Sequence, residues 1–446
     1  MYVEYSSALA AASPARSITH SASRRAKLGL VVVAVLALLL AACSEKSSPT
    51  ASKAGAPSGA SVPDALNDGV TSKEISVGWM GDITGPTASA QVPLMEGSQA
   101  YFQMINDKGG VLGRQIKLVQ ADDQSNAEKA LTNYSSLVKQ THVLAIMGMG
   151  GSAIIPALAP KLAGDQMVVI GPPLTVDAQL TVPYFFNNLA HYADIADVAV
   201  ARASELVGGP TKLVAAVVSL NVSSGTQWNN WVKAKVEAQG GKYAGNVAVN
   251  FTNPDYRTVV TELTNLVQKD HVNAIIWHGT GTTMIGMLTQ MSAVGLKLPI
   301  VGISTAATPT IYTQSPPDMA KLPEGISSFL PCNVETPGGK VLNAYLPGTK
   351  WAGQCTSIPF VQGWVDAMIA HQAMERAAKS GKLDRESFYK AMQGTFDTQG
   401  LTCNIDWSKS NYAPCATPFK WDGQGLQPVN PFATYTDVML KDGVGK

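Results

Sequence analysis

The sequence contains few of the residues that build metal centres. Its 446 residues include five cysteines and six histidines, and no C-x-x-C or H-x-x-x-H spacing occurs among them. Zinc sites normally need such closely spaced ligands. The phosphate-binding loop G-x-x-x-x-G-K-[ST] and the metalloprotease motif H-E-x-x-H are absent as well. We therefore expect no bound metal and no cofactor.

Charged residues are also scarce, at 15% of the chain, and the formal net charge is +1. Removing the four basic residues and the one acidic residue that precede Cys43 brings the net charge to −2. Because nucleic-acid binding calls for a strongly basic face, we expect no nucleic-acid partner. The near balance of charge also argues against long-range attraction of a highly charged ligand.

The sequence lacks a recognisable catalytic constellation. The segment Gly150–Ile154 lacks the last glycine of a nucleophile elbow, and Gly148–Gly151 does not have the spacing of a dinucleotide fingerprint. No nucleophile with an adjacent base can be identified. An enzyme such as a hydrolase is therefore only a remote alternative.

The N-terminal region has the pattern of a secretory signal. Its uncharged apolar run, Leu28–Ala42, is about fifteen residues long, which is too short to span about 30 Å of hydrocarbon comfortably. It follows a basic stretch with one acid, Glu4, and ends at small residues. Leu40-Ala41-Ala42-Cys43 resembles the bacterial lipobox, in which the cysteine is diacylated and becomes the mature N-terminus. An ordinary signal peptide with a chance cysteine is the alternative.

We thus expect residues 1–42 to be a lipoprotein signal peptide and Cys43 to carry the lipid. Two acyl chains give stable anchoring, so the exported protein would be held at the outer face of the cell membrane. The stretch from Ser44 to about Asn67 is rich in Ser, Ala, Gly, Pro and Lys. Such a composition predicts a flexible tether, which we place at 43–70 together with the cysteine.

Four cysteines remain in the exported part, and an even count favours disulfides. Three connectivities are possible. Among them we favour the nearest neighbours, Cys332–Cys355 and Cys403–Cys415.

The rest of the chain alternates between short apolar strands and helices. One set of strands and helices runs from Ile75 to Ile170 and a second from Leu213 to Gly302. Apolar strands separated by helices indicate parallel sheets that are covered on both faces. We therefore predict an α/β fold of two doubly wound lobes joined by a multi-strand hinge. The predicted boundaries are 71–190 plus about 328–400 for lobe I, and 191–327 plus about 401–446 for lobe II.

An ordered set of motifs carries a family resemblance. Gly81–Ala88 is followed by Glu96-Gly97, by Ile105–Gly113 with its Gly-Gly-x-x-Gly turn, and by Asp122-Asp123. This set resembles the branched-chain amino acid-binding family of ABC-transporter receptors, the type I periplasmic binding proteins. The resemblance implies capture of a small polar solute, closure of the lobes and delivery to a membrane permease.

In lobe I the family holds the ligand's carboxylate at two strand ends. The first falls on Gly148–Ala153, where Ser152 and Ala153 begin a helix and offer N–H groups that favour an anion. A plain strand-to-helix turn is the alternative for this segment. The second falls on Ile170–Thr175, where Leu174 and the Thr175 hydroxyl are the expected contacts.

In lobe II the family's amino acid binders use an aromatic residue and a carboxylate to hold the ammonium group. Ungapped matching places these positions on Thr280 and Ser304, and a third contact near Ser224. None of the three carries a negative charge, and burying an ammonium without a carboxylate costs several kcal/mol. We therefore expect a carboxylate or amide-like solute without a free ammonium, rather than an ordinary branched-chain amino acid.

Three further residues complete the predicted site. Asp82, or alternatively Asp177, could restore the missing negative charge, and Thr84 lies in the same loop as Asp82. His278 ends a strand and therefore belongs to the cleft by topology. His278 could either contact the ligand or serve a structural role. If it contacts the ligand, we favour a hydrogen-bond donor role over a catalytic one. The candidate ligand-binding residues are Asp82, Thr84, Ser152, Ala153, Leu174, Thr175, Ser224, His278, Thr280 and Ser304.

These features together predict an extracytoplasmic solute-binding lipoprotein of an ABC importer. We expect it to be a monomer that works with permease and ATPase subunits. Because fold alone does not settle function, a surface-tethered sensor for a receptor kinase is the alternative.

Overall fold

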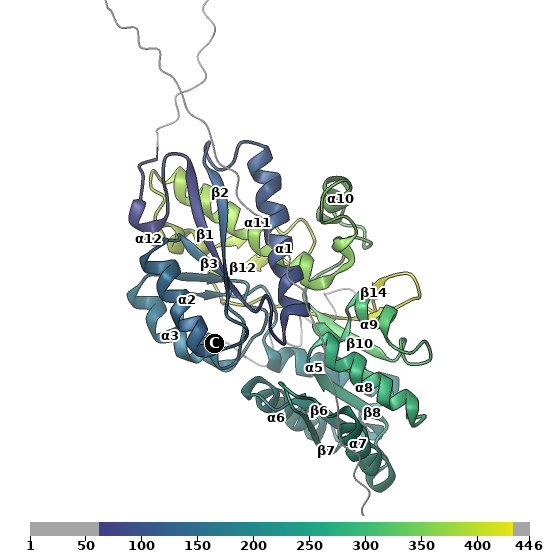
Figure 1. Ribbon diagram of the computed structural model, residues 1–446. Helices are drawn as coiled ribbons and strands as arrows, with labels where there is room; N and C mark the ends of the chain where they lie inside the picture. The colour runs from purple at the N-terminus through teal and green to yellow at the C-terminus, as the bar shows by residue number, and fades with distance from the viewer. Residues whose placement is uncertain (1–61, 431–446) are drawn as a thin grey trace, which may run out of the picture. The chain divides into compact units, whose positions relative to one another are not determined.

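Two mainly parallel β-sheets form the frame of the molecule (Figure 1). The computed structural model describes residues 62–430, which belong to one unit beginning at Ser58. The predicted signal peptide, the lipid-bearing Cys43 and the tether up to residue 61 lie outside the described residues.

The first sheet has five parallel strands in the order β2-β1-β3-β4-β5. They are β1 (Glu74–Gly81), β2 (Gln115–Asp122), β3 (Ala145–Gly148), β4 (Val168–Ile170) and β5 (Phe185–Phe186).

The second sheet has seven strands in the order β14-β13-β10-β9-β8-β6-β7, and only β13 and β14 run antiparallel to their neighbours. They are β6 (Val214–Leu220), β7 (Lys242–Val249), β8 (Ala274–His278), β9 (Ile300–Ile303), β10 (Pro323–Ser327), β13 (Thr417–Trp421) and β14 (Leu426–Pro428). A separate antiparallel pair joins β11 (Thr395–Phe396) and β12 (Ile405–Asp406). The predicted fold class, an α/β protein with two doubly wound sheets, is confirmed.

Alternation of side chains along the strands assigns the helices to two faces of each sheet. In the first sheet, Val77 and Trp79 pack with α1 (Ala88–Asp107) and α11 (Ile358–Lys379), whereas Met80 packs with α2 (Ala127–Lys139) and α3 (Ile154–Gly164).

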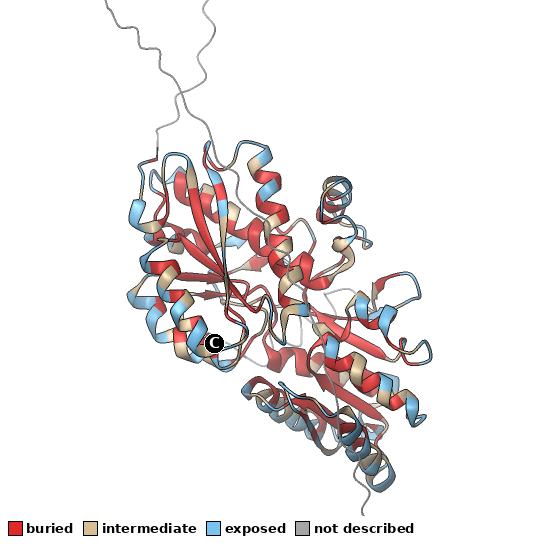
Figure 2. Ribbon diagram, viewed as in Figure 1, coloured by how far each residue is buried: buried red, intermediate tan, exposed pale blue. Residues whose placement is uncertain are grey.

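In the second sheet, Val217 packs with α5 (Tyr192–Leu206) and α6 (Ser223–Ala238), and Val218 packs with α7 (Tyr256–Asp270) and α8 (Gly281–Ala293). The central strands are accordingly buried on both faces, whereas the edge strands β2 and β7 are partly exposed and the helices expose their outer sides (Figure 2). The remaining helices are α4 (Asp177–Leu180), α9 (Pro309–Gln314), α10 (Pro337–Tyr345) and α12 (Arg385–Met392).

Helices α1 and α11 cross at very close range because each contributes a glycine. A Cβ atom at Gly97 would lie 1.9 Å from the carbonyl oxygen of Phe360, and one at Gly363 would lie 1.8 Å from that of Leu94. The Ser98 hydroxyl donates to the Gly363 carbonyl at 3.0 Å across the same crossing. This crossing fixes α11, which comes late in the chain, onto the first sheet.

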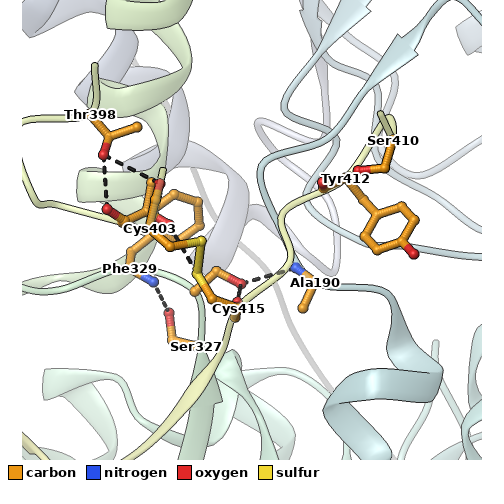
Figure 3. The surroundings of a disulfide bond; sticks show 10 residues. Ala190, Ser327, Phe329, Thr398, Cys403, Ser410, Tyr412 and Cys415 are labelled. Carbon is orange, nitrogen blue, oxygen red and sulfur yellow. Dashed lines mark hydrogen bonds between the residues drawn. A yellow bond between two sulfur atoms is a disulfide. The ribbon is translucent and has the colours of Figure 1, made fainter. Parts of the chain in front are cut away.

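The chain passes between the two sheets three times, after β5, after β10 and before β13. The Ser328 hydroxyl accepts from the Ala190 amide at 3.0 Å and donates to the Cys415 carbonyl at 2.7 Å, so one side chain links all three passages (Figure 3). The structure pairs the four cysteines as Cys332–Cys355 and Cys403–Cys415, the connectivity favoured from the sequence.

Two predicted boundaries differ from the structure. The tether was expected to reach residue 70, but Val62 and Val70 are buried in the first core, and Arg114 donates to the Val62 carbonyl. Lobe II was expected to resume near residue 401, but β12 pairs with β11, and the ring of Trp407 lies 5.2 Å from that of Phe186 in β5. In both places, apolar side chains (Val62 and Val70 in one segment, Trp407 in the other) pack a mostly polar segment against the first lobe.

Candidate functional site

A cavity of about 470 Å³ lies between the two lobes, at the carboxyl ends of both parallel sheets. Its size falls within the range of about 300–1,000 Å³ that is typical of small-molecule sites. Residues from the loops that follow β1, β3, β6, β8 and β9 line it. Open α/β sheets bind their ligands in this position.

Four helices begin at the cavity. The residues that line it include Ala90 in the first turn of α1, Ser152 just before α3, Ser223 at the start of α6, and Thr280 just before α8. The N-terminus of a helix carries a partial positive charge of about +0.5 and unpaired N–H groups. The starts of α3, α6 and α8 therefore present partial positive charge to the cavity without any basic side chain, whereas the Asp82 carboxylate accepts from the Thr87 amide at the start of α1.

The starts of α3 and α6 meet across the two lobes. The Ser223 hydroxyl donates to the Ser152 carbonyl at 3.3 Å. The amides of Ile154 and Ile155 turn back to the Gly151 carbonyl, whereas no backbone acceptor engages the amides of Ser152 and Ala153 in the described part of the chain. These two N–H groups can hold a carboxylate.

Charged side chains do not line the cavity. Among the described lining residues there is no Asp, Glu, Lys or Arg, and residues 62–430 contain no group of three His, Cys, Asp or Glu side chains placed to bind a metal. An ammonium group in the cavity would lack a counterion, and an uncompensated buried charge costs several kcal/mol.

The structure places three of the ten predicted residues outside the cavity lining. Asp82 is fully buried and accepts hydrogen bonds from the amides of Gly85 and Thr87 and from the hydroxyls of Thr87 and Ser125. Its oxygens are thus engaged by its own loop and by Ser125 of the loop that follows β2. Thr84 is exposed and donates to Asp122 at 2.6 Å.

Thr175 is the third residue outside the lining. It is buried, and its hydroxyl donates to the Ala190 carbonyl at 2.9 Å, next to the first passage between the lobes. Asp177, the alternative source of negative charge, lies beside His191, with its Oδ1 3.3 Å from Nε2, and does not line the cavity either. Neither acid therefore supplies the missing charge.

The other seven predicted residues line the cavity: Ser152, Ala153, Leu174, Ser224, His278, Thr280 and Ser304. The Thr280 hydroxyl caps α8 by accepting from the Thr283 amide at 3.2 Å. No hydrogen bond engages the side-chain hydroxyls of Ser152, Ser224 or Ser304 in the described structure, so these three are free for a ligand.

His278 is the last residue of β8 and is 4% exposed. Burial lowers its pKa to about 4, so the ring is neutral at physiological pH. The ring stands edge-on to Tyr192 at 5.6 Å and is tilted against Trp228 at 6.3 Å.

Sequence reasoning missed the apolar part of the lining, which includes Leu189, Tyr192, Ile195, Leu220, Val222 and Phe251. Two of these residues lie on α5, a helix whose sequence shows no periodic apolar pattern. Leu220 is the last residue of β6. The position of Leu220 at a strand's carboxyl end is the signal that could have identified it.

Comparison with known proteins gives a consistent result. A sequence model of a family described as "Periplasmic binding protein" matches residues 74–423. A Pseudomonas aeruginosa protein described as "Amino acid binding protein" is 34% identical over 85 residues, which cover 19% of this chain and only 23% of that relative.

Three solved structures have similar folds. A fatty acid ABC transporter substrate-binding protein from Thermomonospora curvata has a TM-score of 0.73 and 23% identity, covering 84% of this chain and 96% of the other. A branched chain amino acid ABC transporter protein from Thermus thermophilus with bound valine has a TM-score of 0.71 and 20% identity, covering 82% of this chain and 98% of the other. A solute-binding protein from R. palustris in complex with 4-hydroxybenzoate has a TM-score of 0.66 and 16% identity, covering 80% of this chain and 96% of the other. At these identities the likeness shows the fold.

Proposed function

Because the chain belongs to the periplasmic binding protein family, we propose that it captures a small carboxylic acid without a free ammonium group. The family is one of extracytoplasmic solute-binding proteins rather than of enzymes. The ligand would lie in the cavity between the lobes and be delivered to the permease and ATPase subunits of an ABC importer. The observation that carries the proposal is a cavity where four helices begin and which no charged side chain lines.

The carboxylate would bind where α3 and α6 meet. There, the amides of Ser152 and Ala153 have no backbone acceptor, and the hydroxyls of Ser152 and Ser224 are free. Charge-assisted hydrogen bonds to such groups are about twice as strong as neutral ones. The positive ends of the two helices add to this attraction.

The remainder of the ligand would be largely apolar. The side chains of Ile154, Leu174, Ile195, Leu220 and Phe251 line the cavity, and burial of apolar surface contributes about 25 cal/mol per Å². Two structural neighbours are described with a fatty acid and with 4-hydroxybenzoate, both carboxylic acids without an amino group. Their ligands agree with the chemistry proposed for this cavity.

Capture would proceed by closure of the lobes about the three passages. Exposed polar contacts cross between the lobes beside the cavity, namely Ser223 to Ser152 at 3.3 Å and Thr282 to Ser89 at 3.5 Å. Each such bond contributes only about 1 kcal/mol net. Separation of the lobes would therefore break only weak hydrogen bonds beside the cavity, and a bound ligand can shift the equilibrium between the open and closed forms towards the closed one.

The membrane anchor belongs to the same proposal. The lipobox-like segment that ends in Cys43 supports diacylation, which would hold the protein at the outer face of the cell membrane.

Calorimetry with a matched pair of ligands tests the ligand class. Leucine and 4-methylpentanoate share a carbon skeleton and a carboxylate, and differ only in the ammonium group. We expect 4-methylpentanoate to bind at least about 100-fold more tightly, because an unpaired buried ammonium costs several kcal/mol. Tighter binding of leucine would refute the proposed ligand class, and turnover of either compound would refute a pure binding function.

A further inference from the structure

His278 presents a hydrogen-bonding group to the cavity that no protein group satisfies. The residue lines the cavity, and its side chain makes no hydrogen bond in the described structure. Its Nδ1 is sealed from solvent without a partner. Because Nδ1 is the sealed nitrogen, Nε2 is the ring atom that a ligand in the cavity can reach.

The surroundings of the ring keep it neutral and fixed. Tyr192 and Trp228 pack against it, and no charged side chain lines the cavity that it faces. With burial on all sides, the pKa of His278 falls to about 4. A neutral imidazole with an unused nitrogen is a hydrogen-bond acceptor in one tautomer and a donor in the other.

A hydroxyl group suits Nε2 in either tautomer of the ring. It donates to the Nε2 lone pair when the ring hydrogen is on Nδ1, and it accepts when the hydrogen is on Nε2. Because the sealed Nδ1 has no partner, Nε2 is the atom through which a ligand can satisfy the imidazole. A buried polar atom without a partner is costly until a ligand supplies one.

We propose that His278 selects ligands which carry a hydroxyl group in addition to the carboxylate. This inference rests on the proposed function and narrows it from carboxylic acids in general to hydroxylated carboxylic acids. The hydroxyl forms a hydrogen bond with Nε2 of His278, while the carboxylate lies at the start of α3. An acid without the hydroxyl leaves Nε2 unsatisfied, and a site built to bind a hydroxyl discriminates against the analogue that lacks it.

Matched ligand pairs test the inference with the full-length folded protein. We would measure Kd by calorimetry for benzoate and 4-hydroxybenzoate, for 3-phenylpropanoate and 3-(4-hydroxyphenyl)propanoate, and for octanoate and 8-hydroxyoctanoate. In at least one pair the hydroxylated acid should bind about 10-fold or more tightly than its parent. His278→Leu should abolish or reverse this preference, measured as the ratio of the two Kd values within each pair. His278→Gln, which keeps an acceptor at the position, should restore part of the preference.

The outcomes separate the two proposals. If none of the six acids binds, the proposed function fails and the inference fails with it. If the parent acids bind and no hydroxylated partner is preferred, only the inference is overturned. A preference that persists unchanged in His278→Leu also overturns it, because another residue would then recognise the hydroxyl. A structural role of His278 would instead weaken both members of each pair equally, which the ratio of their Kd values detects.

Discussion

Acidification should destabilise the folded protein through His278, and the size of the effect follows from its burial. The ring is 4% exposed, no carboxylate lies among the groups that line its cavity, and its pKa in the folded protein is about 4. In the unfolded chain an ordinary histidine has a pKa near 6.5. The unfolded state therefore takes up a proton between pH 6.5 and pH 4 that the folded state does not.

The sign and size follow from linkage between protonation and folding. His278 contributes stability that is fully present above pH 6.5 and is lost as the pH falls towards 4. Between pH 7.5 and pH 4.5 the two pKa values give a loss of about 2–3 kcal/mol in the free energy of unfolding from this residue alone. That is a large share of the 5–15 kcal/mol that is typical of whole domains.

Other groups titrate in the same range, so the assay must isolate His278. Burial raises the pKa of Asp123 to about 7, which makes its contribution fall as the pH rises, and burial lowers the pKa of His191. Urea unfolding of the wild type and of His278→Gln at pH 7.5 and 4.5 gives four free energies, and their double difference cancels these shared contributions.

We expect the wild type to lose about 2–3 kcal/mol more than His278→Gln over this interval. If the two proteins lose stability in parallel, His278 titrates normally, and both its burial against Tyr192 and its neutrality in the cavity are refuted.

Three further changes test other parts of the structure. Ser304→Asp places a carboxylate in the cavity lining and should raise leucine affinity about 10-fold or more, since a charge pair at 4 Å is worth up to about 4 kcal/mol near a surface; Ser304→Asn is the control by calorimetry, and an equal gain there would contradict the charge argument. Gly97→Ala should cost several kcal/mol in urea unfolding because its Cβ would lie 1.9 Å from the Phe360 carbonyl oxygen; Gly164→Ala, a helical glycine with open space around it, should be neutral or slightly stabilising, and similar losses in both would contradict the crossing geometry. Cys43→Ser should move the protein from the membrane fraction to the soluble fraction of its host on immunoblots; retention in the membrane would contradict lipidation.

The sheets could be predicted because their strands are short apolar runs between helices. β6 and β8 are buried along almost their whole length, so their sequences show no alternation and read as central parallel strands. β5 is only two residues long, and its pattern is too short to be recognised. The extra strand β13 depends on pairing with β10, which is far away in the sequence, and β14 joins the sheet only through β13.

Helix α5 shows why part of the site was not predictable. Ten of its fifteen residues are buried, because it packs against α6 and several strands of the second sheet. A helix that is buried on most sides has no single apolar stripe and gives no 3.6-residue signal. Tyr192 and Ile195, which line the cavity, lie on this helix. Burial by distant parts of the chain removed the local pattern that would have revealed them.

Asp82 illustrates the opposite error: the sequence suggested a ligand-binding carboxylate, but in the structure this carboxylate does not line the cavity. Its position in the loop after β1 made it a candidate partner for an ammonium group. Two loops engage the carboxylate: the amide and hydroxyl of Thr87 in its own loop and the hydroxyl of Ser125 after β2 all donate to Oδ2. Local hydrogen bonding of this kind depends on backbone geometry, so residue type alone could not reveal it.

One arrangement underlies the proposed preference for a carboxylate over an ammonium group. The starts of α3, α6 and α8 present partial positive charges to the same cavity. An ammonium there meets these like charges and also lacks an acidic partner, so the two penalties reinforce each other. For a zwitterionic amino acid, the favourable binding free energy of the carboxylate would be offset by the unfavourable one of the neighbouring ammonium group. With Ser304 rather than an acidic residue in the lining, we therefore expect the cavity to favour a carboxylate without any basic side chain.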